Sequence, residues 1–80
     1  NAVKKFPQPN YVLLKVAEES GEVIKAAVHF AEGRDTATHV REEIVQAMAM
    51  LMRLYLEGDG VNGVPPIHAA YQKESNHDHS

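Results

Sequence analysis

The chain has 80 residues, no cysteine and a formal net charge of −3. A chain this short forms one domain at most and buries only about 60 to 65% of its unfolded surface, so partners are expected. The lack of cysteine excludes a disulfide framework and thiolate chemistry. The basic residues are scattered along the chain, which disfavours a nucleic-acid partner. The chain also lacks an apolar run long enough to span a membrane, which disfavours a membrane partner. We therefore expect a cytoplasmic location.

The first predicted helix follows an extended lead-in. Residues 1–10 contain two prolines, which disfavour a regular helix. Asn10 is a suitable N-cap for the segment that follows. Residues 11–31 show the spacing of an amphipathic helix, and Gly33 is a suitable stop.

A second helix is predicted after the short "GRD" turn, with Asp35 or Thr36 supplying the capping oxygen. Two helices joined by so short a loop must lie antiparallel, so residues 11–57 predict a helical hairpin. Residues 58–80 predict a glycine and proline loop, a polar tail and one short helix around residues 67–72.

Apolar side chains cover more than half of the circumference of both predicted helices. A lone hairpin needs only one narrower stripe on each helix, because each helix has a single neighbour. The predicted fold class is therefore all-α, with an antiparallel hairpin that completes a four-helix bundle by homo-oligomerisation, as a homodimer or homotetramer. Met48, Met50 and Met52 continue the apolar arc and are predicted to pack at a subunit interface.

Carboxylates lie at the border of both apolar arcs. Glu19 and Glu22 are three residues apart, which places them on one strip of the first helix, and Glu43 and Gln46 repeat the spacing on the second. Border strips on paired helices can face each other, and oxygen ligands of this kind suit Mg²⁺. The alternative is a solvated helix edge on which Lys and Glu form ordinary ion pairs.

The stretches "EESGE" at residues 18–22 and "EEIVQ" at residues 42–46 together resemble a family signature. They are similar to the MazG-like all-α nucleoside triphosphate pyrophosphohydrolases, which carry E-x-x-E on one helix and E-x-x-D on the next. The resemblance covers residues 11–57 and implies cleavage of a nucleoside triphosphate to the monophosphate and pyrophosphate. The related phosphoribosyl-ATP pyrophosphohydrolases are an alternative assignment within the same chemistry.

The resemblance also implies a cofactor and a role for each matching residue. The cofactor would be Mg²⁺, with Mn²⁺ as an alternative. The implied metal ligands are Glu19, Glu22, Glu43 and Gln46. The implied catalytic residues are Glu18 and Glu19, with Glu18 supporting the site or activating water. Lys15 lies one turn before Glu19, where it could contact a phosphate of the nucleotide substrate.

Gln46 departs from the signature, which has aspartate at this position. An amide oxygen can coordinate a cation but brings no charge, so the departure weakens the expected Mg²⁺ site. Three outcomes stay open: a weaker or one-metal site, replacement of the missing ligand by Asp59 from the following loop, or a relative without catalysis. The last would be a helical interaction or nucleotide-binding module.

Two other features are given simpler interpretations. His39 lies one turn before Glu43, so a transition-metal site with Gln46 can be imagined, but a solvent-facing side chain is favoured. The "GDGVNG" stretch at residues 58–63 has glycines but lacks the following Lys and Ser or Thr of a phosphate-binding loop. It predicts a flexible exit from the hairpin, with closure over a substrate in an oligomer as the alternative.

Overall fold

The computed structural model describes residues 11–78, and these residues form three α-helices, one short 3-10 turn and no β-strand. The all-α fold class is confirmed for this part of the chain. The predicted lead-in and the predicted cap at Asn10 lie outside the described residues. None of the described helices is long and apolar enough to span a lipid bilayer.

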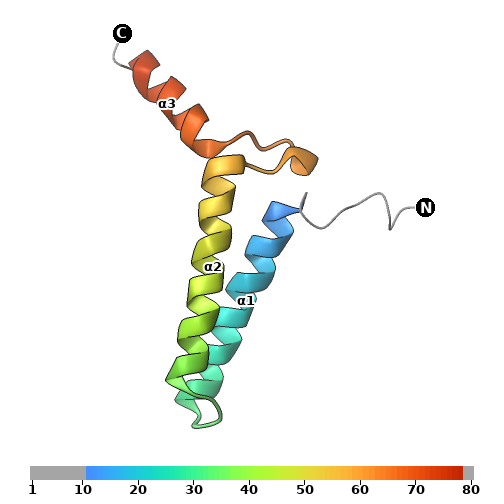
Figure 1. The fold of residues 1–80 in the computed structure, drawn as a ribbon, viewed down its shortest axis with the longest axis vertical. Helices are drawn as coiled ribbons and strands as arrows, with labels where there is room; N and C mark the ends of the chain where they lie inside the picture. The colour runs from blue at the N-terminus through green and yellow to red at the C-terminus, as the bar shows by residue number, and fades with distance from the viewer. Residues whose placement is uncertain (1–10, 79–80) are drawn as a thin grey trace, which may run out of the picture.

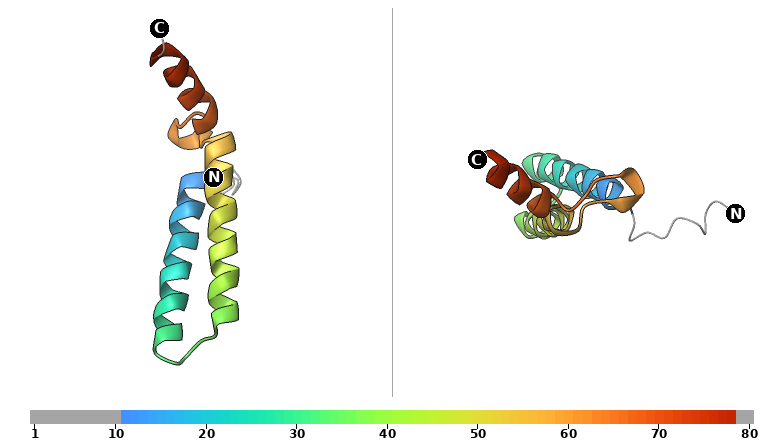
Figure 2. Two further views of the ribbon diagram at one scale, coloured as in Figure 1. Left: turned by 90° about the vertical axis from the view of Figure 1, so that its left-hand side faces the viewer. Right: turned by 90° about the horizontal axis from the view of Figure 1, so that it is seen from above.

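Helices α1 (Val12–Ala31) and α2 (Ala37–Glu57) lie side by side and antiparallel (Figures 1 and 2). The connecting turn uses Gly33 at a φ of +76°, a conformation that glycine adopts without a Cβ penalty. Thr36 Oγ1 accepts a hydrogen bond from the His39 backbone N–H at 3.1 Å and so caps α2. The predicted hairpin is present, and of the two predicted capping residues, Asp35 and Thr36, it is Thr36 that caps α2.

A seam of mostly small and aliphatic side chains joins the two helices. On α1 the half-buried or buried positions recur every three or four residues at Val12, Val16, Glu19, Val23 and Ala26. On α2 the matching half-buried positions are Val40, Glu43, Ala47, Met50 and Leu54. This spacing keeps one stripe of each helix against its neighbour. The hairpin is thus a single layer with one seam.

The loop after α2, which the sequence predicts as a flexible exit, is closed by hydrogen bonds. Gly58 ends α2, and Asp59 and Val64 then exchange backbone hydrogen bonds of 2.7 and 2.9 Å. Between them the 3-10 turn η3 (Gly60–Asn62) begins at Asp59, whose Oδ1 accepts from the Asn62 N–H at 3.1 Å. These bonds close the loop into a compact turn.

The third helix is longer than the predicted turn. Helix α3 (Ile67–Asp78) has 12 residues and begins directly after Pro66, whose carbonyl accepts from the Ala70 N–H at 3.1 Å. It extends away from the end of the hairpin (Figure 1). The rings of Tyr55 and His68, 5.8 Å apart, lie where α2 and α3 meet.

Candidate functional site

Two of the predicted metal ligands lie on the seam between α1 and α2. Glu19 is half-buried, and the side chain of Glu43 is only 15% exposed. Both occupy positions that the 3-4 spacing otherwise fills with valine, alanine, methionine or leucine. One carboxylate of each predicted strip therefore lies at the contact between the helices.

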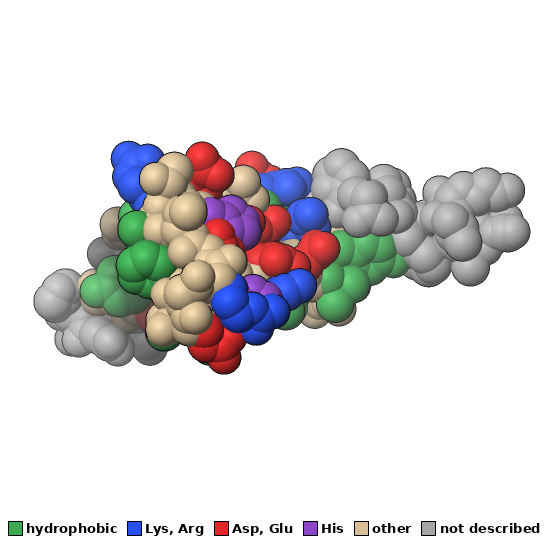
Figure 3. All heavy atoms as spheres, turned by 90° about the horizontal axis from the view of Figure 1, so that it is seen from below, with side chains coloured by type: hydrophobic (Ala, Val, Ile, Leu, Met, Phe, Trp, Pro, Cys, Tyr) green, Lys and Arg blue, Asp and Glu red, His purple; other side chains and the backbone are tan. Residues whose placement is uncertain are grey.

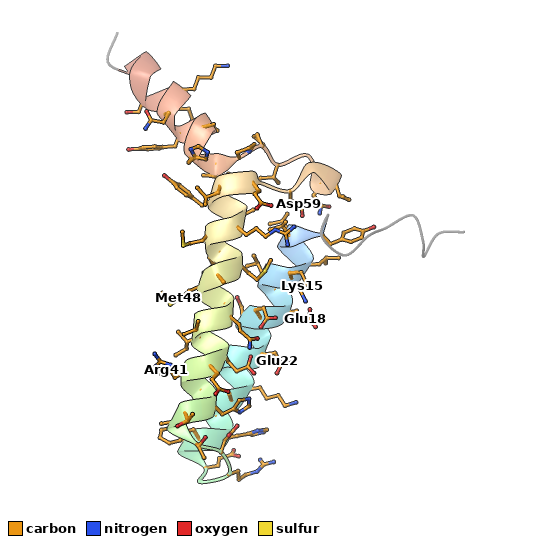
Figure 4. The ribbon with its side chains drawn as sticks, in the orientation of Figure 1. Lys15, Glu18, Glu22, Arg41, Met48 and Asp59 are labelled. Carbon is orange, nitrogen blue, oxygen red and sulfur yellow. The ribbon has the colours of Figure 1, made fainter. Side chains whose placement is uncertain are left out.

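The remaining predicted site residues lie outside the seam. Glu22 and Gln46 are exposed, and the side chain of Glu18 is 60% exposed. Lys15 Nζ lies 3.4 Å from Glu18 Oε1, so this lysine pairs with Glu18 rather than with Glu19. Lys15, Glu18 and Glu22 follow one another along α1 (Figure 4).

The hairpin has two chemically different sides. A groove between the helices is lined by Ser20, Val23, Ile24, Ile44, Ala47, Met48 and Leu51, which we call the apolar side. Residues two positions apart on an α-helix are rotated by about 200° and lie on opposite sides. Glu18 and Glu22 are each two positions from Ser20, and Gln46 is two positions from both Ile44 and Met48. These three polar residues form the opposite, carboxylate side.

The donor chemistry suits Mg²⁺, but the donors are not gathered into one site. Glu19, Glu22, Glu43 and Gln46 offer the carboxylate and amide oxygens that hard cations prefer. Among residues 11–78, however, no three Asp, Glu or His side chains lie close enough together to hold one metal ion. The described arrangement is therefore not a preformed metal centre.

Asp59, the predicted replacement ligand, has another role. Its side chain is buried, at 1% exposure, and lies beside the start of α1 (Figure 4). Oδ2 accepts hydrogen bonds from the Leu13 backbone N–H at 2.8 Å and from Asn62 Nδ2 at 2.9 Å. Asp59 thus caps α1 from the loop that follows α2, so its carboxylate is already occupied by backbone and amide donors rather than placed beside the other predicted metal ligands.

The cap makes the ionised form of Asp59 the favoured one. The hydrogen bond from the Leu13 N–H lowers the pKa of the Asp59 carboxyl below its usual value, and the hydrogen bonds from Asn62 lower it further. Together these bonds outweigh burial, which raises the pKa. A negative charge at this position also complements the positive end of the α1 dipole. The loop and the first turn of α1 are therefore coupled through one carboxylate.

His39 is bonded through both ring nitrogens. Nδ1 lies 2.6 Å from Asp35 Oδ2, and Nε2 lies 3.1 Å from Glu43 Oε2. Acidic, basic and histidine side chains gather at this turn end of the hairpin (Figure 3). The predicted solvent-facing role is too simple, because the ring is half-exposed yet links the turn to a seam carboxylate. The spacing of four residues between Asp35, His39 and Glu43 is visible in the sequence and could have indicated this chain of contacts.

The two carboxylates favour the charged imidazolium. The hydrogen bond to Asp35 raises the pKa of His39 above its usual value, and Glu43 adds to the effect. The same bond lowers the pKa of Asp35. The stabilisation from charged His39 is complete below the ordinary histidine pKa and is lost as the pH rises through the raised value.

We expect NMR titration of the His39 ring to give a midpoint above the usual histidine value. Asp35→Asn should lower this midpoint more than Glu43→Gln does, because Asp35 makes the shorter bond. Glu42→Gln, which alters a neighbouring exposed carboxylate on α2, should leave it unchanged. A midpoint that does not respond to Asp35→Asn would show that the contact is not formed in solution.

Comparison with known proteins assigns neither a family nor a function to the chain. No protein-family model, curated protein or solved structure matches the chain. The likeness to MazG-like enzymes thus rests on the two carboxylate motifs and on their placement in a hairpin.

Proposed function

We propose that the protein is a Mg²⁺-dependent nucleoside triphosphate pyrophosphohydrolase of the MazG-like kind. The observation that carries the proposal is the position of Glu19 and Glu43 on the seam of the hairpin. The motif that suggests the family places acidic residues at these positions, and the fold brings them to the contact between the two helices.

Carboxylates at this seam are hard to explain by stability alone. Removing a charged group from water costs free energy unless partners replace the lost hydration. The structure assigns no ion pair or hydrogen bond to the Glu19 side chain within residues 11–78. Glu43 is bonded only to His39 among the described residues. Apolar residues at these two positions would pack better, which supports a role in binding a cation or a substrate.

Each of the predicted site residues would have one role in this reaction. Glu19, Glu22 and Glu43, with the amide oxygen of Gln46, would hold the metal, whose charge would neutralise triphosphate oxygens. Glu22 and Gln46 are exposed and have the rotamer freedom to turn toward the seam. Glu18 would orient water, and Lys15, already on the same edge, would contact a phosphate.

A direct test is pyrophosphate release from canonical and modified nucleoside triphosphates and from phosphoribosyl-ATP, with Mg²⁺ or Mn²⁺. Glu19→Gln and Glu43→Gln should each lower kcat/KM by about 100-fold or more, because even residues that only orient metal ligands contribute about 10- to 100-fold. Glu42→Gln is the matched control, because it makes the same change at an exposed neighbour, and it should keep activity within about twofold. A lack of pyrophosphate release from every substrate would remove the enzyme proposal.

The second candidate is a non-catalytic helical or nucleotide-binding module. Two observations favour it: Gln46 carries no charge, and Glu43 is already bonded to His39. In this case nucleotide or partner binding should not depend on Mg²⁺. If the wild type is inactive and Gln46→Asp creates pyrophosphate release, the chain is a relative that has lost one ligand.

A further inference from the structure

The loop after α2 contains an asparagine that can react with the backbone that follows it. Asn62 precedes Gly63, and the Gly63 backbone nitrogen can attack Cγ of the Asn62 side chain. Glycine lacks the Cβ that would hinder the approach of these two atoms. The chain's other asparagines precede residues with side chains; they are Asn1, Asn10 and Asn76. Asn62 is therefore the asparagine with the least hindered neighbour.

The surroundings of this pair leave room for the reaction. Asn62 and Gly63 are both exposed, so water reaches them. A Cβ added at Gly63 would meet open space, so no neighbouring group crowds this part of the backbone. The Gly63 N–H donates to the Gly60 carbonyl at 3.3 Å, which is longer than most bonds of this kind. The attacking nitrogen is therefore only weakly held.

A similar pair in the same loop, Asp59 and Gly60, is protected. An ionised carboxylate is a poor electrophile, and the hydrogen bonds to Asp59 favour its ionised form. The Asp59 side chain is also buried and is held by donors of Leu13 and Asn62. Of the two pairs, the structure therefore leaves Asn62 and Gly63 as the reactive one.

Deamidation at Asn62 would take place in two steps. The Gly63 nitrogen attacks Cγ, a new C–N bond forms, and the bond from Cγ to Nδ2 breaks, so that ammonia leaves with the proton of the Gly63 amide. Water then adds to a carbonyl carbon of the cyclic imide and opens the ring to aspartate or isoaspartate. Nothing is oxidised or reduced. The product carries a negative charge where the amide was neutral.

This charge would arise beside the carboxylate that caps α1. Asn62 Nδ2 donates to Asp59 Oδ2 at 2.9 Å, and the same oxygen accepts from the Leu13 N–H at 2.8 Å. Deamidation replaces the Nδ2 donor by an acceptor, so two carboxylates face each other at hydrogen-bonding distance. Because Asp59 is only 1% exposed, water screens their repulsion poorly. Opening of the turn relieves the repulsion and withdraws Asp59 from Leu13.

We propose that Asn62 is a site of spontaneous deamidation, and that this modification irreversibly releases the cap that Asp59 places on α1. The hydrogen bond to Asp59 restrains the Asn62 amide while the turn is closed, so opening of the turn controls the rate. The loop is then a one-way switch from a capped to an uncapped helix. This inference does not rest on the proposed enzyme activity.

Peptide mass spectrometry of the full chain, incubated near neutral pH, tests the reaction. Each conversion of an amide to an acid raises the mass by about 1 Da. Asn62 should convert many times faster than Asn76, the reference asparagine on α3. Asp59→Ala should speed this conversion by about fivefold or more, because the Asn62 amide loses a restraining bond. Gly63→Ala should slow it strongly. Conversion at Asn62 no faster than at Asn76, or unaffected by Gly63→Ala, would overturn the proposal.

Asn62→Asp reproduces one charged product and tests its effect on the cap. It should lower the melting temperature by about 4 to 8 °C or more and raise amide exchange at Leu13 by about fivefold or more. Asn62→Ala is the matched control, because it loses the same donor without adding a charge, and both of its effects should be smaller.

A swapped pair tests whether the two carboxylates repel each other. Asp59→Asn combined with Asn62→Asp again places one amide opposite one carboxylate, so it should regain part of the stability that Asn62→Asp loses. An Asn62→Asp protein as stable as the wild type, losses equal to those of Asn62→Ala, or a swapped pair with no regain would overturn the proposed release of the cap.

Discussion

Gly58→Ala is expected to lower the melting temperature by about 15 °C or more at fixed protein concentration. Gly58 is buried and adopts φ +71° and ψ −156°, a backbone region that is open essentially only to glycine. A Cβ at this position would also lie 2.6 Å from the Pro65 carbonyl oxygen. Strain and clash together should cost about 3 kcal/mol, and 1 kcal/mol shifts the midpoint of a domain this size by about 4 to 8 °C. Thermal unfolding followed by circular dichroism measures the effect.

Gly63→Ala separates the two causes. Gly63 has a similar φ of +76° but lies in the ordinary left-handed region, and a Cβ there would meet open space. It should cost only about 1 kcal/mol, the typical penalty for a left-handed residue other than glycine. Equal losses at the two glycines would show that the Gly58 turn does not pack against Pro65 as described.

Asp59→Ala is expected to destabilise both the loop and the start of α1, lowering the melting temperature by about 5 to 10 °C. Asp59 accepts hydrogen bonds from the Leu13 N–H, the Asn62 N–H and Asn62 Nδ2. Alanine leaves these donors without their acceptor in a site from which water is largely excluded. Amide hydrogen exchange should show faster exchange at Leu13, 46 residues away in the chain, as well as in the loop.

Asp59 also predicts the direction of acid sensitivity. Because its pKa is lowered in the folded protein, its contribution is present above the ordinary aspartate pKa and is lost as the pH falls through the lowered value. Asp59→Asn should therefore be less stable than the wild type near neutral pH, with the difference shrinking in acid. A difference that stays constant with pH would show that ionised Asp59 is not the species that caps α1.

The hairpin was predictable because its cause is local. The 3-4 spacing of apolar residues, the GRD turn and the cap at Thr36 are each contained in a short stretch, and the structure has all three. Helix α3 was predicted as only a short helix because its apolar periodicity is weak. It forms 12 residues because Ala, Gln, Lys and Glu have high helix propensity even without a strong apolar stripe.

The loop and the candidate site depended on contacts that short-range patterns do not specify. Asp59 finds its partner at Leu13, across the hairpin, so no local motif pairs them. The spacing of Glu19, Glu22, Glu43 and Gln46 predicts strips, but it does not determine how far each side chain turns toward the seam. In the structure the four side chains differ in exposure: Glu19 and Glu43 are half-buried at the seam, whereas Glu22 and Gln46 are exposed.

We propose that the seam carboxylates Glu19 and Glu43 help to hold a metal, and Mg²⁺ binding by titration calorimetry with a nonhydrolysable nucleoside triphosphate tests this proposal most directly. The wild type should bind Mg²⁺ in the presence of the nucleotide. Glu19→Gln and Glu43→Gln should each weaken that binding by at least about 10-fold, the lower range for residues that only orient metal ligands, while Glu42→Gln should leave it unchanged. Equal Mg²⁺ affinity in all four proteins would contradict the proposal.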